Sequence, residues 1–86
     1  MAVRFYNLSG YKAFAISYLI EQLNKTTDEK VKTLLYELIQ RAEMLRTRDI
    51  HRFLVRILEI QQQTNINLSA IIPNSEEIQQ IFQYPA

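Results

Sequence analysis

The residues best suited to chemistry lie in one short segment, residues 46–56, with the sequence RTRDIHRFLVR. It contains four arginines and the chain's single histidine. Arginine binds phosphate and carboxylate groups through paired hydrogen bonds, and histidine can transfer protons near neutral pH. The segment could therefore bind an anionic partner or perform acid–base chemistry, or it could be only the solvated face of a helix.

Four arginines of this segment form the candidate anion-binding set. Arg48, Arg52 and Arg56 recur at every fourth residue, which places them on one helical face opposite the apolar side chains. Like charges at this spacing oppose helix formation by roughly 0.2 to 0.5 kcal/mol per pair. Every Lys precedes residue 33, whereas five of the six Arg lie between residues 41 and 56. Because guanidinium binds carboxylate and phosphate bidentately, we expect Arg46, Arg48, Arg52 and Arg56 to bind an anionic partner.

Nucleic acid is one candidate for that partner, and an acidic protein surface is the other. A helix-turn-helix interpretation would take RTRD as the turn and the Arg-rich helix as the reading helix. Such turns often contain Gly, and reading helices usually carry Asn, Gln, Ser or Thr beside Arg; DIHRFLVRILE has neither. The net charge is only +1, so nucleic-acid binding through this face would be weak and salt-sensitive.

The histidine raises the question of catalysis. Arg46 and His51 have four residues between them, and this spacing resembles the R-x(4–6)-H motif of HEPN-type ribonucleases. That family is helical and dimeric, so the resemblance implies an Arg and a His that cleave RNA across a dimer cleft. It covers six residues, and Thr47 follows Arg46 where the family often has Asn, Asp or His. At the edge of a core His51 needs no chemistry, so we expect a non-enzymatic protein, with the ribonuclease as an alternative.

Several other kinds of site lack their residues in this chain. The absence of Cys excludes disulfides, a thiolate nucleophile and Cys-type zinc sites, and there is neither a second His nor a Gly-rich phosphate loop. We therefore expect no metal or cofactor. Apolar stretches are far shorter than the roughly 20 residues of a membrane span, and MAVRFYNLSG lacks the apolar core of a signal peptide. We expect a cytoplasmic protein without a membrane partner.

Helices must position these residues, because apolar side chains recur at helical spacing in three segments and the chain has only one Gly and two Pro. We predict an all-α fold, a small antiparallel bundle of three main helices plus one or two short C-terminal helices. It would form a single domain over residues 1–86, with an N-terminal arm at 1–9 and the short helices at 64–86. The apolar positions are Ile16, Leu19, Ile20 and Leu23 in the first segment, Val31, Leu34, Leu35, Leu38, Ala42 and Leu45 in the second, and Ile50, Phe53, Leu54, Ile57 and Leu58 in the third.

Polar residues indicate where the second and third helices begin. Thr26 and Glu29 match the S/T-x-x-E capping box for the second helix. The apolar stripes of the second and third segments differ by about 100° around a continuous helix. We therefore expect a break at residues 46–49, with Thr47 as the new N-cap. One long bent helix over about 28 to 63 is the alternative.

Aromatic residues give a second candidate surface, since five of the nine lie within the first 18 residues. Tyr11, Phe14 and Tyr18 lie on the side of the first helix opposite Ile16, so either the helix is covered on both sides or these rings contact a partner. Asn74 and Glu77 match a capping box at the start of a C-terminal helix. This helix could contact a partner in the same way. The predicted protein interface consists of Phe5, Tyr6, Tyr11, Phe14, Tyr18, Ile78, Ile81 and Phe82.

These surfaces together predict a binding protein. We expect a non-enzymatic helical protein–protein interaction module, a self-associating adaptor or small regulator with an Arg-rich face for an anionic partner. The alternatives are a nucleic-acid-binding protein that uses the helix at 46–56 and the small dimeric ribonuclease described above.

Overall fold

The computed structural model describes residues 4–85, and the prediction of an all-α fold is confirmed: this part of the chain forms helices and no strand. Residues 1–3 of the predicted arm and residue 86 lie outside the described residues. Within residues 4–85, no helix is both long and apolar enough to span a membrane. The elements in chain order are α1 (Leu8–Lys25), α2 (Glu29–Glu43), the short 3-10 helix η1 (Thr47–Asp49), α3 (Ile50–Thr64), a second 3-10 helix η2 (Ser69–Ile71) and α4 (Ser75–Gln83).

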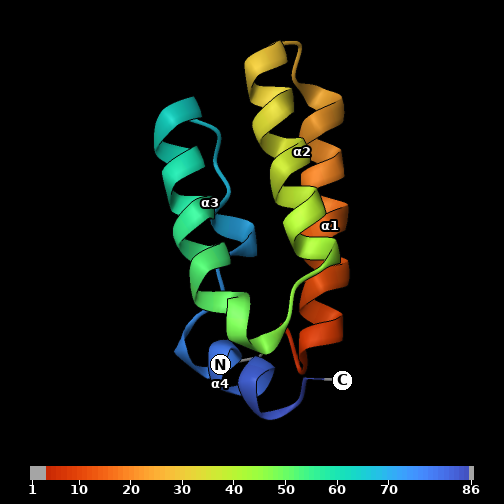
Figure 1. The fold of residues 1–86 in the computed structure, drawn as a ribbon, viewed down its shortest axis with the longest axis vertical. Helices are drawn as coiled ribbons and strands as arrows, with labels where there is room; N and C mark the ends of the chain where they lie inside the picture. Colours follow the sequence, from red (N-terminus) through yellow and green to blue (C-terminus); the bar gives the residue numbers. More distant parts are fainter. Residues whose placement is uncertain (1–3, 86) are drawn as a thin grey trace.

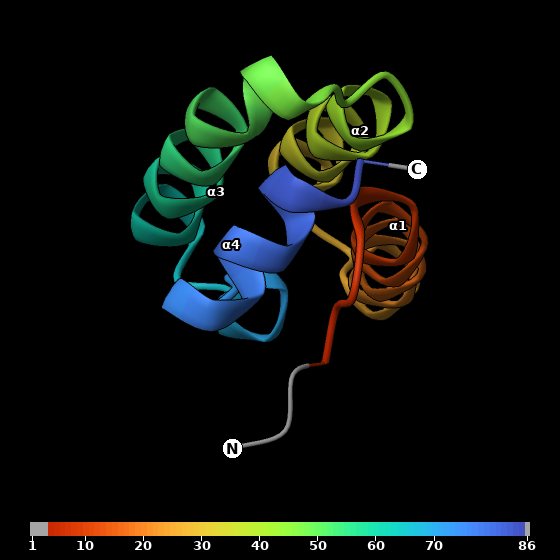
Figure 2. The ribbon, with the colours of Figure 1, turned by 90° about the horizontal axis from the view of Figure 1, so that it is seen from below.

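The three long helices run alternately up and down, and α4 closes one end of the bundle (Figure 1). The chain returns from α3 through η2 to the end where α1 and α3 begin. A view from below shows α4 crossing this end between α3 and α1 (Figure 2). The base of the bundle, where η1 also lies, is therefore built from both ends of the described chain.

Side-chain caps start three of the helices, and the predicted cap of α2 is wrong. Asn7 accepts a hydrogen bond from the amide of Gly10 at 2.7 Å at the start of α1. Asp28, not Thr26, caps α2: its carboxylate accepts from the amide of Lys30 at 2.9 Å. Thr26 ends α1 instead, and its hydroxyl accepts from the amide of Asp28 itself. A carboxylate directly before the helix also suits the positive end of the helix dipole better than a hydroxyl.

The predicted break between the second and third helices is confirmed, but its predicted N-cap is wrong. After α2 the backbone becomes extended at Arg46, with φ −117° and ψ 162°. Thr47 begins η1, and Asp49 occupies the N-cap position of α3 without a capping hydrogen bond from its side chain. The 3-10 turn includes Thr47, the residue predicted to cap, and it separates α2 from α3.

The core face of α1 differs from the predicted one. Tyr11, Ala15 and Leu19 are fully buried, whereas Ile20 is 43% exposed. This face lies between the two apolar stripes seen in the sequence, because α2 covers one side of α1 while η2 covers another. The Tyr11 hydroxyl donates to the carbonyl of Ile71 in η2 at 2.6 Å, and burial raises the pKa of Tyr11 above its usual range. The remaining core includes Val31, Leu35, Leu38, Ala42, Leu45, Ile50, Phe53, Ile57, Ile60, Leu68 and Ile81.

An ion pair between a buried carboxylate and a half-exposed guanidinium joins the N-terminal arm to α4. The Glu77 carboxylate is fully buried and accepts from the backbone amide of Arg4 at 2.8 Å and from its guanidinium at 3.0 and 3.2 Å. Glu77 also completes the predicted capping box with Asn74, which is confirmed. The hydrogen bonds from Arg4 hold the pKa of Glu77 below its usual range. Next to this pair, the amide of Leu8 donates to the carbonyl of Tyr84 at 2.9 Å.

Candidate functional site

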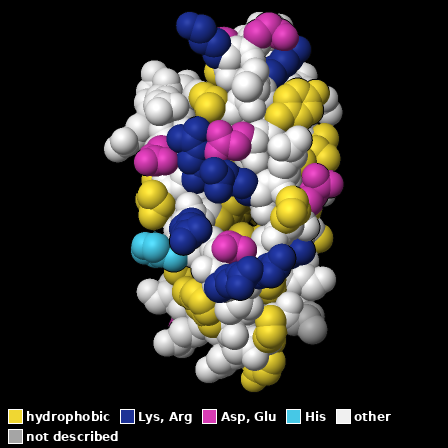
Figure 3. All heavy atoms as spheres, in the orientation of Figure 1, with side chains coloured by type: hydrophobic (Ala, Val, Ile, Leu, Met, Phe, Trp, Pro, Cys, Tyr) yellow, Lys and Arg dark blue, Asp and Glu magenta, His cyan; other side chains and the backbone are white. Residues whose placement is uncertain are grey.

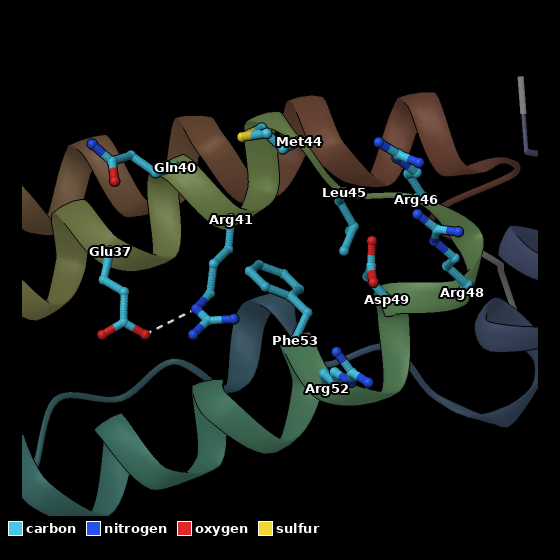
Figure 4. A pocket seen from close by; sticks show the side chains of 10 residues that line it. All are labelled: Glu37, Gln40, Arg41, Met44, Leu45, Arg46, Arg48, Asp49, Arg52 and Phe53. Carbon is cyan, nitrogen blue, oxygen red and sulfur yellow. Dashed lines mark hydrogen bonds and ion pairs between the residues drawn. The ribbon is translucent and has the colours of Figure 1, made fainter.

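An open cavity of about 490 Å³ lies between α2, η1 and the start of α3, and we call it the arginine groove. Figure 3 shows it as a hollow with a hydrophobic floor and basic side chains on both sides. The break between α2 and α3 creates it, since the two helices diverge from η1 at this point. Figure 4 shows the side chains that line it: Glu37, Gln40, Arg41, Met44, Leu45, Arg46, Arg48, Asp49, Arg52 and Phe53.

Three of the four predicted arginines meet in this groove. Arg46, Arg48 and Arg52 all line it, and each is exposed. None of the three forms an ion pair with a residue in the described chain, 4–85. Each guanidinium therefore keeps its hydrogen-bond donors available to a ligand.

The fourth predicted arginine, Arg56, does not contribute to the groove. Its Nε and Nη2 donate to the Glu37 carboxylate at 2.6 and 2.8 Å, and its Nη1 donates to Glu59 at 3.3 Å. Arg48 lies in η1, so only Arg52 and Arg56 keep the predicted spacing on one helix, α3. The packing of α2 against α3 nevertheless brings Glu37 opposite Arg56, and a pattern within one helix does not contain that information.

Arg41 lines the groove in place of Arg56, although the Arg-rich segment at 46–56 does not include it. It donates only its Nε to Glu37, at 2.9 Å, and it lines the groove together with Phe53 (Figure 4). The one available signal is that Arg41 follows Glu37 by one helical turn, the spacing of an ion pair. That pair orients Arg41 along the groove while its two terminal nitrogens stay available.

Glu37 stays ionised at neutral pH. Its carboxylate accepts from both Arg56 and Arg41, and these hydrogen bonds, the one from Arg56 foremost, lower its pKa to about 2. Four arginines line the groove against two acidic residues, Glu37 and Asp49, so the lining has a formal charge of +2. The groove is therefore cationic although the whole chain is nearly neutral.

The floor of the groove is apolar. Leu45 and Phe53 are only 4% and 2% exposed, and the Phe53 ring packs edge-on against Tyr11 with centroids 6.3 Å apart. Met44 is 75% exposed at the rim. A ligand would thus meet a rigid apolar base, a flexible thioether at the edge and several guanidinium groups around it.

His51 lies outside this arrangement. It is exposed in the first turn of α3 and does not line the groove that Arg46 lines. Within residues 4–85 there is also no group of three or more His, Asp or Glu arranged to hold a metal ion. Arg46 and His51, the pair that resembles the ribonuclease motif, therefore do not both line this groove.

The predicted aromatic surface is largely internal. Phe5, Tyr11 and Ile81 lie in the core, which corrects their assignment to an interface. Phe5 packs edge-on against both Tyr11 and Phe14, with ring centroids 5.1 and 5.0 Å apart, because the arm folds back onto α1. Tyr18 and Ile78 are partly buried, and the residues that remain exposed are Tyr6, Phe14 and Phe82.

The comparisons with known proteins leave the site to be interpreted from its own chemistry. The chain matches no protein-family model, and neither the curated proteins nor the solved structures contain a significant match.

Proposed function

We propose that this protein is a non-enzymatic helical interaction module that binds an acidic segment of a partner protein in the arginine groove. The observation that carries the proposal is the meeting of Arg46, Arg48 and Arg52, none with an ion-pair partner in residues 4–85, around a concave cavity. Carboxylates bind guanidinium groups bidentately, and a hollow admits protruding side chains.

The apolar floor favours a peptide over nucleic acid. Single-stranded nucleic acid is usually held by aromatic rings on which its bases stack. The only aromatic residue among those that line the groove is Phe53, and it is too deeply buried to offer a ring face. Aliphatic side chains of a peptide, in contrast, could contact the exposed Met44 while neighbouring carboxylates reach the arginines.

The shape of the charged surface also disfavours duplex DNA. A reading helix has to protrude into the major groove, whereas these arginines surround a hollow between two helices. Nor does the nearly neutral chain supply the broad basic field that contacts many phosphates.

Fluorescence anisotropy with a labelled peptide Glu-Glu-Leu-Glu-Glu would test the proposal. Replacing Arg52 with Glu removes one attraction and adds one repulsion, each about 1 kcal/mol for exposed charges, so we expect Kd to rise roughly thirtyfold. Lys30→Glu is the matched control, because Lys30 is an exposed cation near the far end of α2 with the same change of charge. We expect it to change Kd by less than about threefold, since salt screens distant charges.

Three results would contradict the proposal. Equal effects of Arg52→Glu and Lys30→Glu would show that only the overall charge matters. Tighter binding of a labelled single-stranded oligonucleotide than of the peptide, abolished by Arg52→Glu, would assign the groove to nucleic acid instead. Turnover of a labelled RNA that is lost in His51→Ala would establish the ribonuclease alternative.

A further inference from the structure

A second hollow adjoins the arginine groove at the base of the bundle. It has a volume of about 620 Å³ and lies where α1 begins, and we call it the terminal hollow. It shares two residues with the groove, Leu45 and Arg46, so Arg46 stands between the two cavities. Its complete lining is Leu8, Ser9, Lys12, Leu45, Arg46, Thr47 and Pro85.

The terminal hollow repeats the chemistry of the groove. Lys12 and Arg46 supply two cations, no acidic residue lines it, and Lys12 forms no ion pair with the described residues 4–85. Its floor includes Leu8 and Leu45, which are 5% and 4% exposed. The hydroxyls of Ser9 and Thr47 add hydrogen-bonding groups at the edge. Cationic side chains over an apolar floor thus extend on both sides of Arg46.

We infer that the two cavities form one continuous binding track for an extended acidic segment of the partner protein, with Arg46 at its centre and Lys12 at its far end. This inference rests on the proposed function of the groove. Hollows of these volumes are each on the order of 8 Å across, so the track is about 16 Å long. An extended chain advances about 3.3 Å per residue, so about five residues would cover it. A single anionic side chain or a free phosphate would occupy only one of the two cavities.

The length of the track can be tested with two peptides of equal length that differ in where their charges lie. The first is Glu-Glu-Gly-Ser-Gly, whose two charges fit within one cavity, and the second is Glu-Glu-Leu-Glu-Glu, whose charges extend over both. Lys12→Glu should weaken binding of the second peptide about tenfold and leave binding of the first within about threefold. Lys30→Glu, with the same change of charge, measures the long-range electrostatic effect on each peptide. Lys12→Gln should show a smaller loss in the same direction, and circular dichroism verifies that each variant is folded.

The inference and the proposed function fail in different ways. If the wild-type protein binds neither peptide, the proposed function is wrong. If both peptides bind and Arg52→Glu weakens both, but Lys12→Glu affects the second no more than Lys30→Glu does, the groove acts alone and the track is refuted. Loss of the second peptide's affinity in Lys12→Glu, beyond that in Lys30→Glu, supports the track.

Discussion

Replacement of Glu77 by Gln should destabilise the protein strongly, because Glu77 is the only fully buried charged residue among those described. The substitution keeps the side-chain shape but removes the negative charge of the carboxylate, whose oxygens accept three hydrogen bonds from Arg4. Breaking a buried ion pair typically costs about 3 to 5 kcal/mol. The Arg4 side chain is 46% exposed, so water offsets part of the loss, and we expect about 2 to 3 kcal/mol.

This loss is a large share of the total stability. The free energy of unfolding of an 86-residue domain is about 4 to 13 kcal/mol. The substitution should therefore lower the midpoint of thermal unfolding by roughly 10 to 20 °C. Urea unfolding followed by circular dichroism would measure the free energy of unfolding. Glu76→Gln is the matched control, since Glu76 is the exposed neighbour without an ion pair in the described chain, and its effect should stay within about 0.5 kcal/mol.

The difference between the wild-type protein and Glu77→Gln should also depend on pH. The pKa of Glu77 in the folded protein lies below the ordinary value of 4.5. Its contribution to stability is therefore fully present above about pH 4.5 and is lost as the pH falls through the lowered pKa. Equal free energies of unfolding for Glu77→Gln and Glu76→Gln at neutral pH, or a difference that persists unchanged in strong acid, would refute this account of the ion pair.

Two smaller perturbations test individual hydrogen bonds. Tyr11→Phe removes the hydroxyl that donates to a main-chain carbonyl of η2, and it should cost about 1 to 2 kcal/mol in urea unfolding; no loss would mean that the carbonyl finds another donor. Asp28→Ala should cost about 1 kcal/mol because it removes the cap of α2, whereas Thr26→Ala should cost less; the opposite order would restore the capping box expected from the sequence.

The helices of this protein could be predicted from local patterns, but their contacts could not. The apolar stripe of α2 and the capping box of α4 are each contained within a few consecutive residues. The buried face of α1 depends instead on where α2 and η2 pack, and the two flanking stripes gave no means of choosing between them. The ion pair of Arg4 with Glu77 joins residues 73 positions apart and leaves no local signal.

The candidate site shows the same division. Arg46, Arg48 and Arg52 could be selected because their clustering and residue type are visible in the sequence. The exchange of Arg56 for Arg41 could not, because it depends on which turn of α2 faces which turn of α3 and hence on the position of Glu37. The cavity lies where the helical structure is interrupted between α2 and α3. Its shape depends on how the two helices pack, which local sequence patterns do not specify.

The contacts between the N-terminal arm and α4 link the folding of the protein to binding at the terminal hollow. α4 has only nine residues, and the Arg4–Glu77 pair and the hydrogen bond from Leu8 to Tyr84 join it to the other end of the chain. These contacts close a loop of most of the chain, so we expect them to form after the local helical contacts. Pro85, which follows directly, forms one wall of the terminal hollow. A partner that occupies this hollow would therefore bind only the closed form, and by mass action it would hold the two ends of the protein together.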